Sequence, residues 1–135
     1  MPQRLPSLQT FIDEVRAIWA QDSDNAVRVA KAKPAMEKLL QDKTLQAMSE
    51  DWPSTEGRKN LLLYVDPDHE FAISAVVRVP GRKGSIHDHG PVWVMYGVLT
   101  GTEDLERYDR IDDGRDESFV QVKLNSIGKG HTGKV

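Results

Sequence analysis

Residues 81–101, GRKGSIHDHGPVWVMYGVLTG, contain the pattern on which the interpretation of this chain depends. Two histidines, His87 and His89, stand one residue apart, and an uninterrupted apolar run over residues 92–99 follows them. A run that is apolar at every position is typical of a strand that is buried on both faces. The stretch therefore predicts a buried β-strand with a pair of histidines just before it.

The spacing of the two histidines favours metal binding. In an extended chain the side chains alternate between two faces, so His87 and His89 would point one way and Asp88 the other. Their Cα atoms would lie about 6.6 Å apart, which is twice the strand rise. Imidazole suits iron, nickel, copper and zinc, whereas calcium and magnesium prefer oxygen ligands. The pair predicts half of a transition-metal site, although two polar residues at a strand end would show the same spacing.

Composition narrows the class of protein. The chain has 135 residues, a formal net charge of −3 and no cysteine. This length suits one domain, 1–135, and the charge gives no reason to expect a nucleic-acid partner. Without cysteine, disulfides, thiolate metal sites and a cysteine nucleophile are excluded, so a metal must use His, Asp or Glu. No signal peptide and no run of roughly 20 apolar residues is present, so we expect a cytoplasmic protein without a membrane partner.

The first fifty residues, 1–50, have helical spacing. Apolar residues recur at intervals of three and four, which predicts a helix over residues 7–20 with Ser7 as its N-cap. These apolar residues are Phe11, Val15, Ile18 and Trp19. A second helical region extends over residues 24–48, where Pro34 lacks an amide hydrogen and is expected to divide it into two shorter helices.

The remainder of the chain shows short strands. LLLYV (residues 61–65) and FAISAVVRV (residues 71–79) flank DPDHE, which predicts a hairpin with an exposed His69 in its turn. A second hairpin is predicted between DLERYDR (residues 104–110) and SFVQVKL (residues 118–124). Alternating apolar residues in its second strand indicate one solvent-exposed face. The acidic loop between these strands does not match the spacing of a calcium loop.

Glycines extend the pattern around the histidines. Gly81 precedes His87 by six positions, and Gly101 closes the apolar run. This arrangement resembles the first motif of the cupins, G-x5-H-x-H-x3/4-E-x6-G, except that Val94 occupies the position of the glutamate ligand. The thiol dioxygenase branch of the cupins, which comprises cysteine dioxygenase and 3-mercaptopropionate dioxygenase, has no glutamate ligand. The stretches SIHDH and WVMYGVLTGTEDLERY resemble the pattern of that branch.

The resemblance implies a mainly β fold, a cupin-type double-stranded β-helix or jelly-roll barrel over residues 58–135, after the N-terminal helical region. It implies Fe(II) bound by three histidines, two of them His87 and His89, with Zn, Mn or Ni as other metals. Dioxygen and a small thiol or carboxylic acid would be the substrates, and a thiol would leave as its sulfinate. A homodimer is one way to cover the outer face of the apolar run.

Two positions depart from the family's pattern. Val94 also stands where the mammalian cysteine dioxygenases have a cysteine crosslinked to a tyrosine, a crosslink that bacterial relatives lack. Members of the branch bind the substrate carboxylate with an arginine, because a guanidinium pairs with a carboxylate through two hydrogen bonds. Asn60 occupies that position here, with Arg58 and Lys59 beside it. The resemblance therefore leaves the residue that would bind the carboxylate open.

The third ligand and the catalytic residues are also left open. His131, in GKGHTGKV, is one candidate for the third ligand. The other interpretation places this ligand and the closing strands beyond Val135, in a domain that is shortened at its C-terminal end. Three functions follow from these alternatives. They are an iron-dependent thiol dioxygenase, a non-enzymatic cupin that binds or senses a small molecule, and a zinc or manganese cupin that acts as an isomerase or hydrolase.

Overall fold

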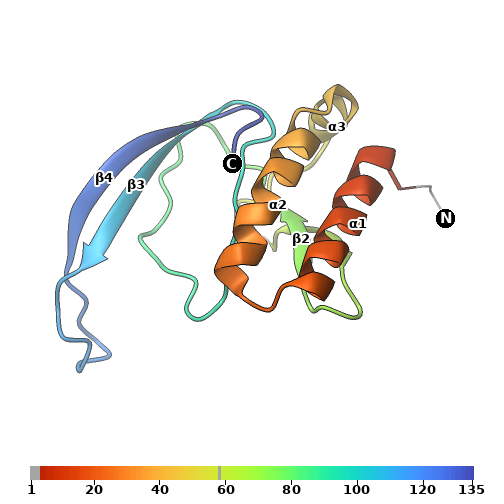
Figure 1. Ribbon diagram of the computed structural model, residues 1–135. Helices are drawn as coiled ribbons and strands as arrows, with labels where there is room; N and C mark the ends of the chain where they lie inside the picture. The colour runs from red at the N-terminus through yellow and green to blue at the C-terminus, as the bar shows by residue number, and fades with distance from the viewer. Residues whose placement is uncertain (1–3, 58) are drawn as a thin grey trace.

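The computed structural model describes residues 4–57 and 59–135, so the predicted region boundaries at residues 1 and 58 lie outside it. Within the described residues, three helices precede four strands, and the strands form two separate two-stranded sheets (Figure 1). The elements are α1 (Pro6–Gln21), α2 (Asn25–Leu40), α3 (Lys43–Ser49), β1 (Leu61–Val65), β2 (Ala72–Ala75), β3 (Thr102–Arg110) and β4 (Val122–His131).

Helix α1 confirms the predicted N-terminal helix, but it begins differently. Pro6 opens the helix, where its fixed φ is suitable and its missing amide hydrogen costs nothing. Leu5 occupies the N-cap position and makes no side-chain capping bond. The prediction that Ser7 caps the helix is therefore wrong, because Ser7 already lies inside the first turn.

The region after α1 forms two helices, as predicted, but the division lies elsewhere. Asp24 caps α2 by accepting hydrogen bonds from two backbone amides of the first turn at 2.8 and 3.2 Å. Pro34 lies inside α2, which continues to Leu40. The chain breaks at Gln41 instead, and the carboxylate of Asp42 caps α3. Packing of α2 on α1 thus outweighs the single backbone bond that a proline removes.

The hydrophobic core lies mainly between the helices. Ile12 of α1 is its most enclosed large side chain, with 1% of its surface exposed. The core residues are Leu8, Phe11, Ile12, Val15, Ala32, Leu39 and Leu45. The aromatic rings of Trp19, Tyr64 and Phe71 extend the core to the first hairpin, since the ring of Phe71 lies 5.8 Å from Trp19 and 5.9 Å from Tyr64.

The hairpin of β1 and β2 confirms the first predicted strand pair. The strands are antiparallel, and Val65 pairs with Ala72 next to the DPDHE turn. His69 lies in this turn as predicted, but it is half-buried, not exposed. This hairpin lies behind α1 and α2 in the view of Figure 1, so the helices do cover a sheet, although a small one.

Strands β3 and β4 form the second hairpin, but only its first strand lies where the sequence predicts it. The second strand was predicted over residues 118–124, whereas β4 spans Val122–His131, so most of the predicted segment belongs to the loop. The two strands form an antiparallel ribbon that projects away from the helices (Figure 1). The pairing passes from Arg107 with Ser126 directly to Tyr108 with Leu124. Asn125 is therefore an extra residue on β4, which is a β-bulge.

The predicted jelly-roll barrel is wrong. Over the described residues the chain is 30% helix and 24% strand, and the two small sheets do not join into a closed barrel. The apolar run 92–99 was expected to be a buried strand, yet Trp93 and Val94 are 56% and 47% exposed. Only Val98 forms bridges, with Thr132 and Lys134. A strand is buried on both faces only inside a sheet that other layers cover on each side, and here the run 92–99 joins neither sheet.

Candidate metal site

His87 and His89 lie side by side in a segment that belongs to no strand. The centroids of their rings are 5.2 Å apart, and the ring planes meet at 84°, edge to face. Rings of residues two positions apart come together only when both side chains leave the same side of the backbone. The predicted convergence of the two imidazoles is therefore present, and metal binding by them stays a prediction.

A hydrogen bond fixes the proton on one ring of the pair. Nδ1 of His87 lies 2.9 Å from the backbone oxygen of Ser85. A carbonyl oxygen can only accept, so Nδ1 donates in this contact, and in the neutral imidazole Nε2 then keeps a free lone pair. Metal-binding histidines are commonly oriented by such a bond to their other nitrogen. The contact leaves Nε2 of His87 suited to be a ligand.

The segment that carries the pair lies alongside strand β3. Near its start, Nε of Arg78 lies 3.5 Å from a carboxylate oxygen of Glu103, and further along Nζ of Lys83 lies 3.8 Å from one of Glu106. These partners occur in the same order on both segments, so residues 78–88 run along β3 from its first residues toward its last. The histidine pair is thereby placed toward the Arg110 end of β3.

Charges at that end of β3 are already paired. Arg110 and Asp112 form an ion pair at 2.9 Å. The pKa of Arg110 is raised, first by its hydrogen bond to Asp112 and to a smaller extent by the charge of Asp88. Asp88 also accepts a hydrogen bond from the amide of Gly90 at 3.0 Å, which closes the turn behind the histidines. The carboxylate of Asp88 thus accepts a hydrogen bond within the turn, and its charge acts on Arg110 without an ion pair between them.

The other predicted ligand is not brought to the pair. His131 is the last residue of β4 and pairs with Thr102, at the opposite end of β3 from Arg110. Among residues 4–57 and 59–135, no three His, Asp or Glu side chains lie close enough together to hold a metal ion. The described part of the chain therefore presents two adjacent imidazoles with no third protein ligand beside them.

Of the positions predicted to bind a substrate carboxylate, the structure describes Lys59 and Asn60. Arg58 lies outside the described residues, and its neighbours Lys59 and Asn60 are exposed just before β1. Val94, which occupies the position of the glutamate ligand in the motif, is also exposed. Binding of a substrate carboxylate near Asn60 stays a prediction.

A polar cluster that sequence reasoning missed lies at the start of β3. The hydroxyl of Tyr96 donates a hydrogen bond to Glu103, and the same carboxylate pairs with Arg78. Burial and the neighbouring Glu103 raise the pKa of Tyr96 to about 12. Arg78 is distant from the other two residues in the sequence, so no local pattern indicates its contact with Glu103. Tyr96 and Glu103 are only seven positions apart, on either side of the turn at Gly101, and this proximity in the sequence is the one signal for their hydrogen bond.

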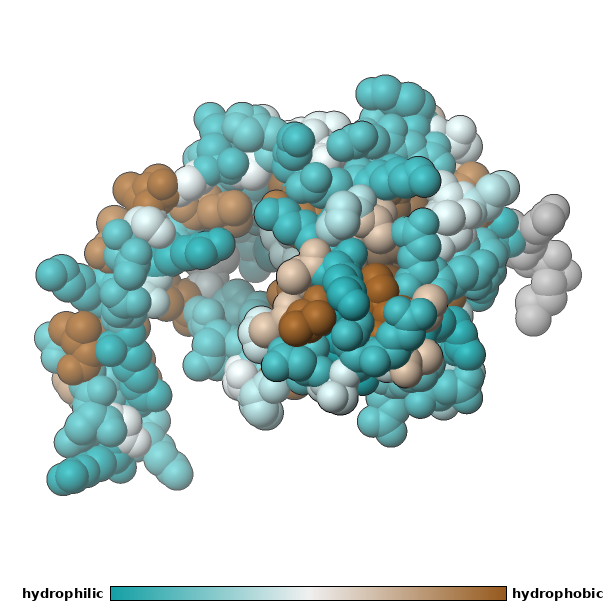
Figure 2. Space-filling view, in the orientation of Figure 1, coloured by the Kyte–Doolittle hydropathy of each residue, from teal (hydrophilic) through white to brown (hydrophobic). Residues whose placement is uncertain are grey.

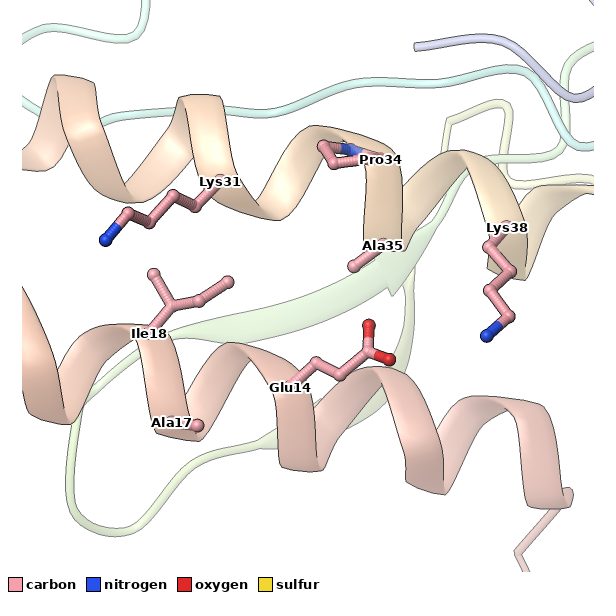
Figure 3. Close-up of a pocket in the computed structure, with 7 residues that line it drawn as sticks. All are labelled: Glu14, Ala17, Ile18, Lys31, Pro34, Ala35 and Lys38. Atoms are coloured by element: carbon pink, nitrogen blue, oxygen red, sulfur yellow. The ribbon is translucent and has the colours of Figure 1, made fainter.

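A hollow of about 500 Å³ lies between α1 and α2 (Figure 3). It is lined by Glu14, Ala17, Ile18, Lys31, Pro34, Ala35 and Lys38. Ile18 of α1 and Ala35 of α2 lie in the space between the two helices, and the ammonium group of Lys31 already binds Asp22 at 2.7 Å. The lining contains neither histidine of the pair, so this hollow and the candidate metal site are separate features.

No family model, curated protein or solved structure matches this chain. The resemblance to the thiol dioxygenases therefore depends on the residues of the 81–101 stretch and those that follow it. None of the three helices in the described part of the chain has the length and apolar content that crossing a membrane requires.

Proposed function

We propose that this chain binds a transition metal through His87 and His89 and acts as an Fe(II)-dependent dioxygenase that oxidises a small thiol, such as cysteine or 3-mercaptopropionate, to its sulfinate. The observation that carries the proposal is the 5.2 Å separation of the two imidazole rings. The bond from Nδ1 of His87 to Ser85, which leaves Nε2 free, supports it. A cytoplasmic location belongs to the same proposal.

The donor set agrees with iron only in part. Two neutral imidazoles suit two positions on a transition-metal ion. A catalytic iron centre of this kind uses three protein ligands, and the described residues bring together two. Bound iron would supply the oxygen chemistry. Because the third ligand is missing from this arrangement, we derive no step of the reaction through the metal.

Metal titration tests the histidine pair. Purified protein titrated with Fe(II) in the absence of oxygen should bind it, and His87→Ala and His89→Ala should each abolish this binding. His69→Ala is the matched control, because His69 lies in the β1–β2 turn and should leave binding unchanged. Loss of binding in His131→Ala would identify the third ligand. Wild-type binding by both His87→Ala and His89→Ala would contradict the proposal.

Oxygen consumption tests the reaction separately from the metal. Iron-loaded protein should consume dioxygen with cysteine or 3-mercaptopropionate and release the matching sulfinate, which mass spectrometry detects. Protein that binds iron through His87 and His89 yet consumes no oxygen with either thiol would contradict the thiol assignment and leave the metal site standing.

A second candidate function follows from the missing third ligand. The chain would then be a non-enzymatic module that binds or senses a small acid. Under this alternative, wild-type protein would show no Fe(II) binding, while 3-mercaptopropionate or cysteine would still shift its amide resonances in an NMR titration. Fe(II) binding that depends on His87 and His89 would favour the dioxygenase instead.

A further inference from the structure

Among the described residues, no strand pairs with the outer edge of strand β4. β4 has ten residues, eight of them exposed, and pairs with β3 along one edge. Residues 78–83 lie beside β3 through the ion pairs of Arg78 with Glu103 and of Lys83 with Glu106, whereas no strand pairs with the outer edge of β4 within the described ranges. The ribbon makes little contact with the helices or with the first hairpin. Two-stranded ribbons are marginally stable in water, and a long free edge favours pairing with a further strand.

The bulge at Asn125 changes which residues of β4 share a face. Residues directly opposite one another on paired strands lie on the same face. Leu124 is opposite Tyr108, and Ile127 is opposite Glu106. Because Tyr108 and Glu106 are two positions apart on β3, Leu124 and Ile127 share a face although three positions separate them. The next residues outward, Lys123 and Gly128, lie on the opposite face, and Val122 and Lys129 lie on the first face again. The order of the faces is therefore the same toward both ends of β4.

A strand with this symmetry can pair with a second copy of itself. A two-fold axis perpendicular to the sheet leaves every side chain on the face of the sheet that it already occupies. Two residues that oppose each other across the axis must have side chains on the same face. This requires the order of faces along β4 to be the same in both directions from the axis. In β4 this condition is met with the axis between Asn125 and Ser126. Leu124 of one copy then lies opposite Ile127 of the other. The remaining opposed pairs are Asn125 with Ser126, Lys123 with Gly128, and Val122 with Lys129.

This register is favourable in charge and in hydrophobicity. Neither Lys123 nor Lys129 lies opposite another charge, so no like charges oppose each other across the axis. Leu124 and Ile127 are 44% and 71% exposed in the single chain. With their counterparts they would form a cluster of four apolar side chains on one face. Figure 2 shows apolar surface exposed on the arm that the ribbon forms.

We propose that β4 pairs with β4 of a second copy of this chain across a two-fold axis between Asn125 and Ser126. The two ribbons then form one four-stranded antiparallel sheet in the order β3, β4, β4, β3. The interface uses backbone hydrogen bonds along β4 and the apolar contact of Leu124 with Ile127. This dimer does not depend on metal binding by the histidine pair.

Disulfide crosslinking tests the register, because the native chain has no cysteine. The double variant Leu124→Cys/Ile127→Cys should give disulfide-linked dimers on a non-reducing gel. Within one chain the two positions lie opposite Tyr108 and Glu106, which are about 6.6 Å apart by strand rise, and an internal disulfide would leave the chain running as a monomer on the same gel. The matched control is Lys123→Cys/Ile127→Cys, in which the two thiols lie on opposite faces and should not crosslink. Equal crosslinking of both variants would overturn the register.

Solution mass measurements test the dimer itself. Light scattering after size exclusion at high micromolar concentration should give a dimer for the wild type. Ile127→Lys should raise the dissociation constant by about tenfold or more, because it removes buried apolar area at two symmetric positions. Val79→Lys, at an exposed valine outside the ribbon, is the control and should remain dimeric. A monomeric wild type, an open-ended assembly, or an unaffected Ile127→Lys dimer would each overturn the proposal, with circular dichroism confirming that the variants fold.

Discussion

The carboxylate of Asp66 accepts hydrogen bonds from the guanidinium of Arg16 and the hydroxyl of Tyr64, although Arg16 lies fifty positions away in the sequence. Asp66 is only 2% exposed, and it also accepts the backbone amides of Asp68 and His69 at 3.2 and 2.8 Å. A second nitrogen of Arg16 reaches Asp68 at 2.6 Å. One buried carboxylate therefore joins helix α1 to the turn between β1 and β2.

This arrangement predicts a loss of stability at low pH. Burial alone would raise the pKa of Asp66, but the hydrogen bonds from Tyr64, Arg16 and the turn amides outweigh it and hold the pKa well below its usual range. The unfolded chain, with an Asp pKa of about 3.9, takes up the proton first. The stabilisation is thus fully present above that pH and is lost as the pH falls below it.

Thermal unfolding followed by circular dichroism from pH 7 to about pH 2 measures this effect. Asp66→Asn should lower the melting temperature by several degrees at pH 7 and flatten its decline below about pH 4, because the variant has no proton to gain at this position. Asp68→Asn is the control, since the side chain of Asp68 is 62% exposed and should matter less. Parallel curves for wild type and Asp66→Asn would refute the assigned role.

A close contact at Gly97 predicts that this position does not accept a side chain. A Cβ atom there would lie 2.3 Å from Cδ1 of Leu40 and 3.1 Å from the backbone oxygen of Lys134. The same oxygen accepts the amide of Val98 at 3.0 Å, so it cannot withdraw without losing that bond. Gly97→Ala should lower the free energy of unfolding by about 1–3 kcal/mol in a urea titration, as is usual for overpacking.

Gly84→Ala is the matched control for this change, because a Cβ atom at Gly84 meets nothing within 4 Å. Its free energy of unfolding should stay close to that of the wild type. Equal midpoints for Gly97→Ala and the wild type would show that α2 and the C-terminal residues do not approach Gly97 as described.

The ionisation of Tyr96 provides a third prediction. Burial, and then the hydrogen bond to Glu103, raise its pKa to about 12 from the ordinary value of about 10. The contribution to stability is therefore present below pH 10 and is lost as the pH rises toward 12. In a titration of tyrosinate absorbance, the difference between wild type and Tyr96→Phe should show one late-ionising group. Glu103→Gln should move this ionisation to lower pH.

Tyr108 is the internal comparison in that titration, because its pKa is also raised, through its hydrogen bond to Glu106. Tyr108→Phe should leave the late ionisation of Tyr96 in place. If the difference spectrum of Tyr96→Phe showed ionisation near pH 10, the contact between Tyr96 and Glu103 would not exist in solution.

Features that depend on neighbours in the sequence could be predicted. Helix α1 followed from apolar spacing, and the first hairpin followed from short strands around turn residues. The second hairpin followed in the same way, except that its second strand lies further along the chain than predicted. The convergence of His87 and His89 is likewise local, because alternation of side chains is enough to bring residues two positions apart together. The continuation of α2 through Pro34 could not be predicted, since it depends on packing against α1, which the local sequence does not contain.

Features that depend on distant partners were missed or wrong. The apolar run 92–99 was expected to be a buried strand, but strand formation requires ladder partners, and its composition does not specify them. The same limit applies to the third metal ligand, which spacing around the histidine pair cannot locate. The contacts of Asp66 with Arg16 and of Tyr96 with Glu103 join segments that no motif connects.

Because the hydrophobic core lies between the helices, selection for folding acts mainly on the helical residues and much less on the ribbon of β3 and β4. Substitutions among the buried residues of α1 and α2 alter folding, so those positions are constrained whatever the protein does. Strands β3 and β4 contribute little to that core, and changes there alter folding less. The ribbon could therefore acquire a new partner or lose an old one through single substitutions, while the helical part continues to fold.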